Sequence, residues 1–154
     1  MKIFVMVGTH KMGFVRLLEK MDELGKKHDV VMQIGYSDFK PMNAKYFKFC
    51  DFGEYLRLHK WADVIVTHGG LGGILDALQN RKPLIVAPRM KRYGEHTNDH
   101  QLDITKEVAK EGLAIAVYDM GKMEDAIRRA AKFRPKMQSG ATIKMIQEYL
   151  GAME

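Results

Sequence analysis

A group of ionisable and amide side chains crowds the segment GEHTNDHQ, which follows the short apolar run at 83–88. Its members are Glu95, His96, Asp99, His100 and Gln101. The amide of Gln101 can both donate and accept hydrogen bonds, as recognition of sugar hydroxyl groups requires. Two histidines beside two acids could instead hold a metal ion, but the chain has one cysteine and no HExxH spacing, so we expect no zinc site.

A second group surrounds the glycine-rich turn HGGLGG, which lies between the apolar runs at 62–67 and 83–88. Short apolar runs with β-branched residues are typical of buried parallel strands, and ILDALQN after the turn reads as a helix. The first turn of such a helix exposes free N–H groups and a partial positive charge, which suits a phosphate. Alternatively, the glycines only allow close packing. The turn matches neither GxGxxG nor the P-loop, so both interpretations stay open.

These groups need a framework of alternating strands and helices. The predicted strands are 2–7, 28–35, 45–50, 62–67, 83–88 and 113–118, and the predicted helices are 14–24, 52–61, 74–80, 97–111, 123–133 and 141–150. Such alternation indicates βαβ units with right-handed crossovers. We therefore predict an α/β fold, a Rossmann-like parallel sheet with helices on both faces. Ligands of such sheets bind outside the carboxyl ends of the strands, where both polar loops fall.

Composition limits the remaining possibilities. The chain has 154 residues, 46% hydrophobic and 29% charged, which predicts one globular domain over 1–154. Cys50 is the only cysteine, so we expect no internal disulfide and a cytoplasmic setting; its apolar neighbours suggest a packing role. The net charge of +6 would suit nucleic acid, an anionic membrane or a phosphorylated substrate. No basic-aromatic motif favours nucleic acid.

Several motifs together resemble one protein family. They are MKIFVMVGTH, VMQIGYS, THGGLGG, KPLIVAPR and GEHTNDHQ. They resemble the C-terminal domain of glycosyltransferase family 28, which is the nucleotide-sugar half of a GT-B enzyme. The resemblance covers about 1–117, and GEHTNDHQ after KPLIVAPR is its most specific part. It is strongest to stand-alone small subunits of two-part UDP-sugar transferases, in the dolichol pathway and in bacterial exopolysaccharide synthesis.

The resemblance implies a set of substrate-binding residues and names no catalytic one. Gly8, Thr9 and His10 would approach the diphosphate, and His68, Gly69, Gly70 and Gly72 would line the donor site. Asp76 stands where relatives usually hold a glutamate that receives the ribose hydroxyls, although it could also be a solvated helix acid. The rest of the set is Pro88, Arg89, Glu95, His96, Asp99, His100 and Gln101.

The resemblance also implies an activity and a partner. We expect binding of a UDP-sugar, UDP-GlcNAc or UDP-glucuronate, without a metal cofactor, and transfer of the hexose to a lipid-diphosphate-linked acceptor. A membrane-anchored subunit would hold that acceptor and recruit this chain to the cytoplasmic face of the membrane. The C-terminal segment 123–150 would be the docking element for this subunit. The alternative is a non-catalytic nucleotide-binding module with a regulatory or scaffold role.

Overall fold

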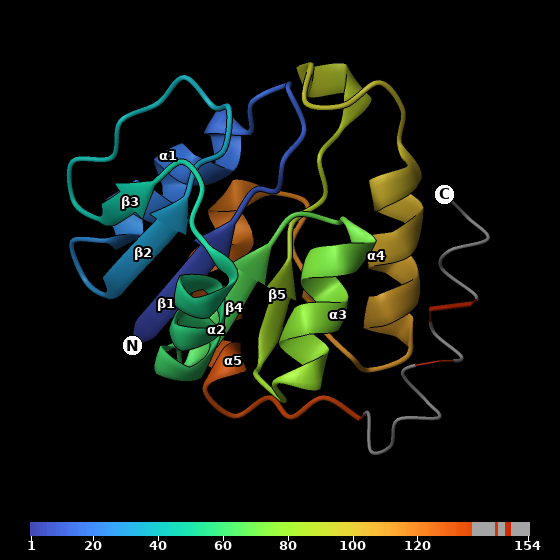
Figure 1. Cartoon of the computed structure of the whole chain (residues 1–154). Coiled ribbons are helices and arrows are strands. Elements are labelled where there is room, and N and C mark those ends of the chain that lie inside the picture. The colour runs from blue at the N-terminus through green and yellow to red at the C-terminus, as the bar shows by residue number, and fades with distance from the viewer. Residues whose placement is uncertain (137–143, 145–146, 149–154) are drawn as a thin grey trace.

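A six-stranded sheet forms the centre of the molecule. The computed structural model describes residues 1–136, 144 and 147–148. The strand order is β3-β2-β1-β4-β5-β6, and every pairing is parallel (Figure 1). The strands are β1 (Lys2–Met6), β2 (Asp29–Gln33), β3 (Lys45–Phe47), β4 (Val64–Thr67), β5 (Leu84–Val86) and β6 (Ile115–Ala116). This order is the doubly wound arrangement of Rossmann folds.

Helices cover both faces of the sheet. They are α1 (Val15–Leu24), α2 (Phe52–Trp61), α3 (Leu71–Gln79), α4 (His100–Lys110) and α5 (Met123–Ala130). One apolar core joins α1 and α5 to one face, and a second joins α2, α3 and α4 to the other. Because both faces are covered, β4 is apolar almost throughout and all four of its residues are buried. The predicted α/β Rossmann-like fold with helices on both faces is confirmed.

The order of the strands reverses at β1. This strand pairs with β2 on one side and with β4 on the other, through Ile3 opposite Val30 and Ile3 opposite Val64. The connections that leave β1 and β4 therefore run to opposite faces of the sheet. A crevice between such diverging connections is where open α/β sheets bind ligands. The turns after β1 and β4 are the two glycine turns of the sequence.

The structure corrects several predicted boundaries. The strand predicted at 45–50 ends at Phe47, opposite the last residue of β2. The loop that follows ends in Asp51, whose carboxylate caps α2 by accepting from the Glu54 N–H. The helix predicted from residue 97 begins at His100. Asp99 occupies the N-cap position without a side-chain capping bond, and Oδ1 of Asn98 accepts from the His100 N–H at 3.0 Å.

The structure describes only part of the C-terminal segment 123–150. The apolar residues of α5 are buried in the core beneath the sheet, because the helix repeats them on a single face. They are Met123, Ala126, Ile127 and Ala130. This face is therefore not available to dock a partner. The helix predicted at 141–150 lies mostly outside the described residues, so its docking role stays a prediction.

Candidate functional site

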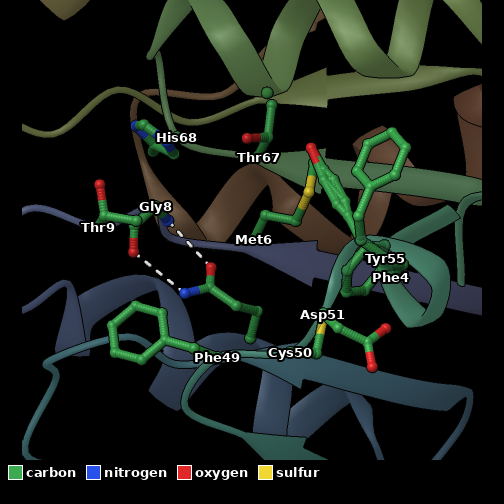
Figure 2. A pocket seen from close by; sticks show the side chains of 13 residues that line it. Phe4, Met6, Gly8, Thr9, Phe49, Cys50, Asp51, Tyr55, Thr67 and His68 are labelled. Atoms are coloured by element: carbon green, nitrogen blue, oxygen red, sulfur yellow. Dashed lines mark hydrogen bonds between the residues drawn. The ribbon is translucent and has the colours of Figure 1, made fainter.

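A cavity of about 380 Å³ opens at the carboxyl edge of the sheet, between the ends of β1 and β4 (Figure 2). Gly8 and Thr9 after β1 line it, and so do Thr67 and His68 at the end of β4. The opposite wall comes from the loop before α2 and from α2 itself. Its residues are Phe49, Cys50, Asp51, Phe52 and Tyr55. The cavity thus lies at the point where the strand order reverses.

The turn after β1 needs a glycine at position 8. Gly8 has a φ of +83°, and a Cβ atom there would lie 2.5 Å from Nε2 of His68, so any side chain would collide with the imidazole. The N–H of Gly8 donates to Oε1 of Gln33 at 3.0 Å, and Nε2 of Gln33 donates back to the Gly8 carbonyl at 3.1 Å. Gly8 therefore shapes the turn, while its own N–H group is already satisfied by Gln33.

The second glycine turn presents the start of α3. Gly69 N–H donates to Oε1 of Gln101 at 3.0 Å, and Gly70 N–H donates to Nδ1 of His68 at 3.1 Å. No hydrogen bond from the N–H groups of residues 71–73 to a described residue is present outside the helix, and no acidic residue lies in this first turn. A helix start with free N–H groups is an anion site.

Two polar side chains face this helix start. His68 is partly buried, and burial together with the charge of Arg89 lowers the pKa of His68 to about 3, so its ring is neutral. Because its Nδ1 accepts from Gly70, its proton is on Nε2, the atom beside Gly8. The hydroxyl of Thr67 is buried without a hydrogen-bond partner among the described residues. The Nε2–H of His68 is therefore the donor available to a ligand in the cavity, and the Thr67 hydroxyl lies buried beside Gly73.

The opposite wall is aromatic. Phe49 is 46% exposed and Phe52 is 73% exposed. The Tyr55 ring stacks on His59 at 4.4 Å between centroids. Its hydroxyl donates to Oδ2 of Asp76 at 2.5 Å. Burial and the Asp76 carboxylate raise the pKa of Tyr55, so the hydroxyl keeps its proton, and Oδ1 of Asp76 accepts from no described residue. Asp76 is therefore hydrogen-bonded to Tyr55, which lines the cavity.

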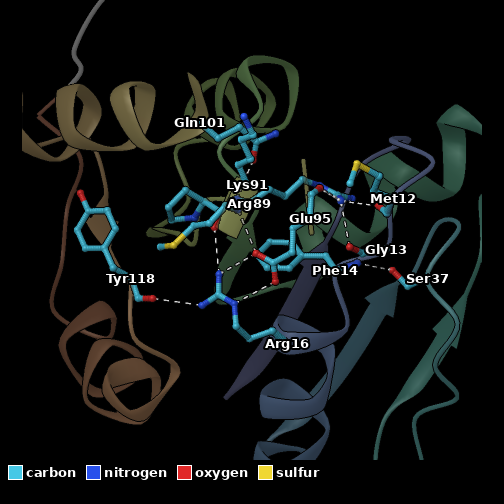
Figure 3. A network of polar contacts seen from close by, with 12 residues as sticks. Met12, Gly13, Phe14, Arg16, Ser37, Arg89, Lys91, Glu95, Gln101 and Tyr118 are labelled. Carbon is cyan, nitrogen blue, oxygen red and sulfur yellow. Dashed lines mark hydrogen bonds and ion pairs between the residues drawn. The ribbon is translucent and has the colours of Figure 1, made fainter. Parts of the chain in front are cut away.

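Behind the cavity, buried Arg89 and partly exposed Arg16 tie three loops together (Figure 3). Arg89 is 1% exposed, and its guanidinium donates to the carbonyls of Val7 at 2.6 Å, Met12 at 2.6 Å and Glu95 at 3.0 Å. Burial lowers the pKa of Arg89 to about 10, so the group stays charged at neutral pH. Arg89 therefore supports the turn after β1 through hydrogen bonds from the interior of the protein.

A salt bridge continues this network. Arg16 in α1 donates to both carboxylate oxygens of Glu95, at 3.0 and 3.1 Å, and to the carbonyls of Pro88 and Tyr118. Glu95 is 4% exposed and also accepts from the Met90 N–H. Glu95 thus fixes the loop between β5 and α4 to α1.

Gln101 joins this loop to the other glycine turn. Its Oε1 accepts from Gly69 N–H and from Arg89 N–H, each at 3.0 Å, and the residue is 7% exposed. The predicted contact of Gln101 with a sugar would therefore have to come from its Nε2. That contact stays a prediction.

The predicted residues fall into three groups. Gly8, Thr9 and His68 line the cavity. Buried behind it are Gly69, Pro88, Arg89, Glu95 and Gln101. The others lie outside the cavity lining. They are Gly70 and Gly72 at the start of α3, Asp76 farther along α3, Asp99 and His100 at the start of α4, and the histidines His10 and His96, whose tilted rings lie 4.5 Å apart between centroids. Substrate binding by each of them stays a prediction.

Across residues 1–136, 144 and 147–148, no group of three or more His, Cys, Asp or Glu side chains is arranged to hold a metal ion. In the same residues, no helix has the length and apolar character needed to cross a bilayer.

The family is decided by comparison with known proteins. A model of the glycosyltransferase family 28 C-terminal domain matches residues 2–150. The chain belongs to this family. The predicted resemblance is confirmed, and the fold is the one found in the C-terminal half of GT-B glycosyltransferases.

Curated relatives of this family 28 domain are much longer proteins. The human UDP-N-acetylglucosamine transferase subunit ALG13 is 32% identical over 101 residues, which is 62% of this chain and 8% of the relative. The mouse protein of the same name is 32% identical over 98 residues, 60% of this chain and 8% of the relative. The chain thus spans less than a tenth of the length of these relatives.

Solved structures share the fold of the family 28 domain. The crystal structure of the glycosyltransferase of kitacinnamycin has a TM-score of 0.66 at 24% identity, over 99% of this chain and 39% of that one. The NMR structure of ALG13 has a TM-score of 0.64 at 16% identity, over 94% of both chains. MurG of Acinetobacter baumannii has a TM-score of 0.57 at 16% identity, over 96% of this chain and 50% of that one.

The sequence did not reveal one wall of this domain's cavity. Phe49, Phe52, Tyr55, Gln33 and Thr67 were not predicted as site residues, although all line it. Gln33, Phe49 and Thr67 stand near the carboxyl ends of predicted strands, and Phe52 and Tyr55 lie in the predicted helix 52–61. Their closeness to the carboxyl edge of the sheet was the available signal. Cys50 is also exposed and lines the cavity, so its predicted packing role is wrong. Partial burial against the cavity wall raises the pKa of the Cys50 thiol, and the nearby carboxylates of Glu54 and Asp51 act in the same direction.

Proposed function

We propose that this domain binds a UDP-sugar in the cavity and serves as the donor half of a two-component glycosyltransferase. The observation that carries this proposal is the make-up of the cavity. One end offers the free N–H groups at the start of α3 beside the Nε2–H of His68, and the other end offers exposed aromatic rings. A nucleoside diphosphate has the matching parts, an anion and a flat base, and bases stack on aromatic side chains.

The carboxylate of Asp76 lies between these two ends in the proposed complex. Tyr55 holds Oδ2, which leaves Oδ1 to accept from a ribose hydroxyl. This arrangement compensates for the shorter side chain of aspartate where relatives usually hold glutamate, since Tyr55 fixes its direction.

The chemistry assigned to this domain is stabilisation of the leaving group. When the bond between the sugar and the diphosphate breaks, negative charge develops on the diphosphate. Fixed N–H donors at the start of α3 and on His68 meet that charge without rearrangement, which is the most effective kind of electrostatic stabilisation. A general base that deprotonates the acceptor hydroxyl would come from the other component.

The same proposal extends to sugar, acceptor and location. The sugar is N-acetylglucosamine or glucuronate, and the acceptor is lipid-diphosphate-linked. A membrane-anchored subunit holds the acceptor and recruits this domain to the cytoplasmic face of the membrane. The human and mouse relatives support the first choice of sugar, because they are named as subunits of a UDP-N-acetylglucosamine transferase.

Calorimetry with UDP in the presence of a chelator tests the donor site. We expect binding by the isolated chain without a divalent metal, because backbone N–H groups and imidazoles supply the donors. Binding that appears only after Mn²⁺ or Mg²⁺ is restored would contradict the metal-free site. Absence of UDP binding under both conditions would overturn the proposed function.

Turnover distinguishes a transferase from a nucleotide-binding module. We expect no transfer by the isolated chain, and transfer from UDP-GlcNAc or UDP-glucuronate once the acceptor-binding component is added. UDP binding without transfer in the reconstituted pair would favour a regulatory or scaffold module.

A further inference from the structure

Three histidines at the carboxyl edge of the sheet share one local arrangement. In each, Nδ1 accepts a hydrogen bond from the backbone N–H two residues later. The pairs are His10 with Met12 at 3.1 Å, His68 with Gly70 at 3.1 Å and His96 with Asn98 at 3.3 Å. A neutral imidazole has one acceptor and one donor nitrogen. The backbone therefore fixes the same tautomer three times, with the proton on Nε2.

The rings of His10 and His96 lie together although they come from different loops. Their centroids are 4.5 Å apart, with an angle of 34° between the planes. The buried guanidinium of Arg89 donates to the carbonyls of Met12 and Glu95, which are close neighbours of these two histidines in the chain. Arg89 thus holds in place the two backbone segments that carry the histidine pair.

The charges around the pair oppose its protonation. Burial and Arg89 lower the pKa of His10. Burial, His10, Arg89 and His100 lower the pKa of His96, and Asp99 acts on it in the opposite direction. Both rings are also close enough to His68 to lower the pKa of that residue. A proton could enter only at Nδ1, where it would break the bond from the backbone N–H.

We propose that His10 and His96 form, beside His68, a neutral imidazole pair that donates two Nε2–H groups to the diphosphate of the sugar nucleotide. The positive charge of the site comes from buried Arg89, which does not touch the ligand. The pair binds no proton when the ligand binds, because its Nδ1 atoms remain acceptors for Met12 and Asn98. This inference rests on the proposed function and adds to it the protonation state and two donors.

Asparagine substitutions separate binding from a structural role. The Oδ1 of asparagine can replace Nδ1 as acceptor for the backbone N–H, but no donor remains at the place of Nε2. We expect His10→Asn and His96→Asn to keep the thermal midpoint and the affinity for uridine, which lacks phosphates. We expect each to lower the affinity for UDP-GlcNAc roughly tenfold, since hydrogen bonds to charged groups are strong. His96→Ala should lower the thermal midpoint as well.

The pH dependence tests the neutral state. UDP-GlcNAc has no phosphate group that titrates near neutrality, so any change reports the protein. We expect the wild-type affinity to stay flat between pH 8.5 and 6.5. The calorimetric heat, corrected for buffer ionisation in two buffers, should show no proton uptake. If the histidines became cationic on binding, the affinity would instead rise as the pH falls, by up to about tenfold per pH unit for one proton.

The outcomes separate this inference from the proposed function. If the wild-type chain binds neither uridine nor UDP-GlcNAc, the proposed function fails and the inference falls with it. If it binds UDP-GlcNAc but both asparagine variants bind equally well, the donor role of the pair is wrong. Uptake of a proton on binding overturns the neutral state while leaving the proposed function in place.

Discussion

The two ends of the cavity are built in different ways. At one end, buried polar groups fix the backbone: Arg89 is 1% exposed, and Glu95 is 4% exposed. At the other end, Phe49 and Phe52 leave 46% and 73% of their surface in solvent. The first end is complete before a ligand arrives. The second presents apolar surface that only a ligand or a partner would cover.

The difference follows from what each end is proposed to meet. Charge is stabilised best by dipoles that are already in place, because reorienting them would consume part of the gain. Stacking on an aromatic ring depends mainly on contact area and tolerates small shifts. A rigid polar end and an open aromatic end are therefore suited to a diphosphate and a base, respectively.

Substitution of Arg89 should have the largest effect. Arg89→Met leaves the buried carbonyl of Val7 and the partly buried carbonyl of Met12 without their donor. We expect the free energy of unfolding, measured in urea, to fall by at least about 3 kcal/mol, because several hydrogen bonds to a charged group are lost. Arg128→Met is the matched control. Arg128 is 69% exposed in its salt bridge with Asp125, and we expect a change below about 1 kcal/mol. Equal stability of both variants would show that the buried network is not what holds the loops.

Substitution of Gly8, in the turn after β1, should have the second-largest effect. Gly8→Ala and Gly94→Ala both place a side chain at positive φ, +83° and +68°, which costs on the order of 1 kcal/mol in each. Only the Gly8 methyl meets a neighbour, the Nε2 of His68, whereas Gly94 faces open space. Calorimetry should show that UDP binding is lost in Gly8→Ala and retained in Gly94→Ala. Retention in both would mean that the turn after β1 tolerates displacement.

A substitution at the aromatic end of the cavity should lower the affinity for UDP without lowering the stability of the fold. Phe52→Ala removes an exposed ring that lines the cavity, so we expect UDP affinity to fall about tenfold, since stacking on a base contributes on the order of 1–3 kcal/mol. The unfolding midpoint should hardly move. Tyr46→Ala, at a 42% exposed position in β3, is the control and should bind UDP normally. A wild-type affinity for Phe52→Ala would place the base elsewhere.

Tyr55 should give the smallest and most specific effect. Tyr55→Phe removes one hydrogen bond to Asp76, which is worth about 1 kcal/mol. If Tyr55 directs Asp76 at the ribose, the preference for UDP over 2′-deoxy-UDP should shrink a few-fold. Competition binding with both nucleotides measures it. An unchanged preference would leave Tyr55 with a packing role.

Local patterns predicted most of the framework. Helix α2 was predicted at 52–61, where it lies, and the structure shows that Asp51 caps it. The strands were found because segments buried on both faces must be apolar. The strand at 45–50 was predicted too long, since the run YFKFC is apolar beyond Phe47. Those extra apolar residues belong to the cavity wall, which no strand pattern can reveal.

Hydrogen bonds between segments that are distant in the sequence could not be predicted from local patterns. Arg89 was predicted to bind substrate, and it follows a strand at the carboxyl edge. In the structure its guanidinium donates to the carbonyls of Val7 and Met12. Carbonyl groups are the same in every residue, so the sequence carries no sign of which ones an arginine will reach. The same holds for Gln101, whose partners are two backbone N–H groups.

The exposed thiol in the cavity wall offers a natural attachment site for a probe of ligand binding. Cys50 is the only cysteine of the chain and lies beside Phe49 and Asp51 in that wall. A maleimide fluorophore would therefore label one defined position without any engineering, slowly at neutral pH because the thiol pKa is raised. Occupancy of the cavity can then be followed in two ways, as protection of the free thiol from alkylation and as a change in emission of the labelled chain.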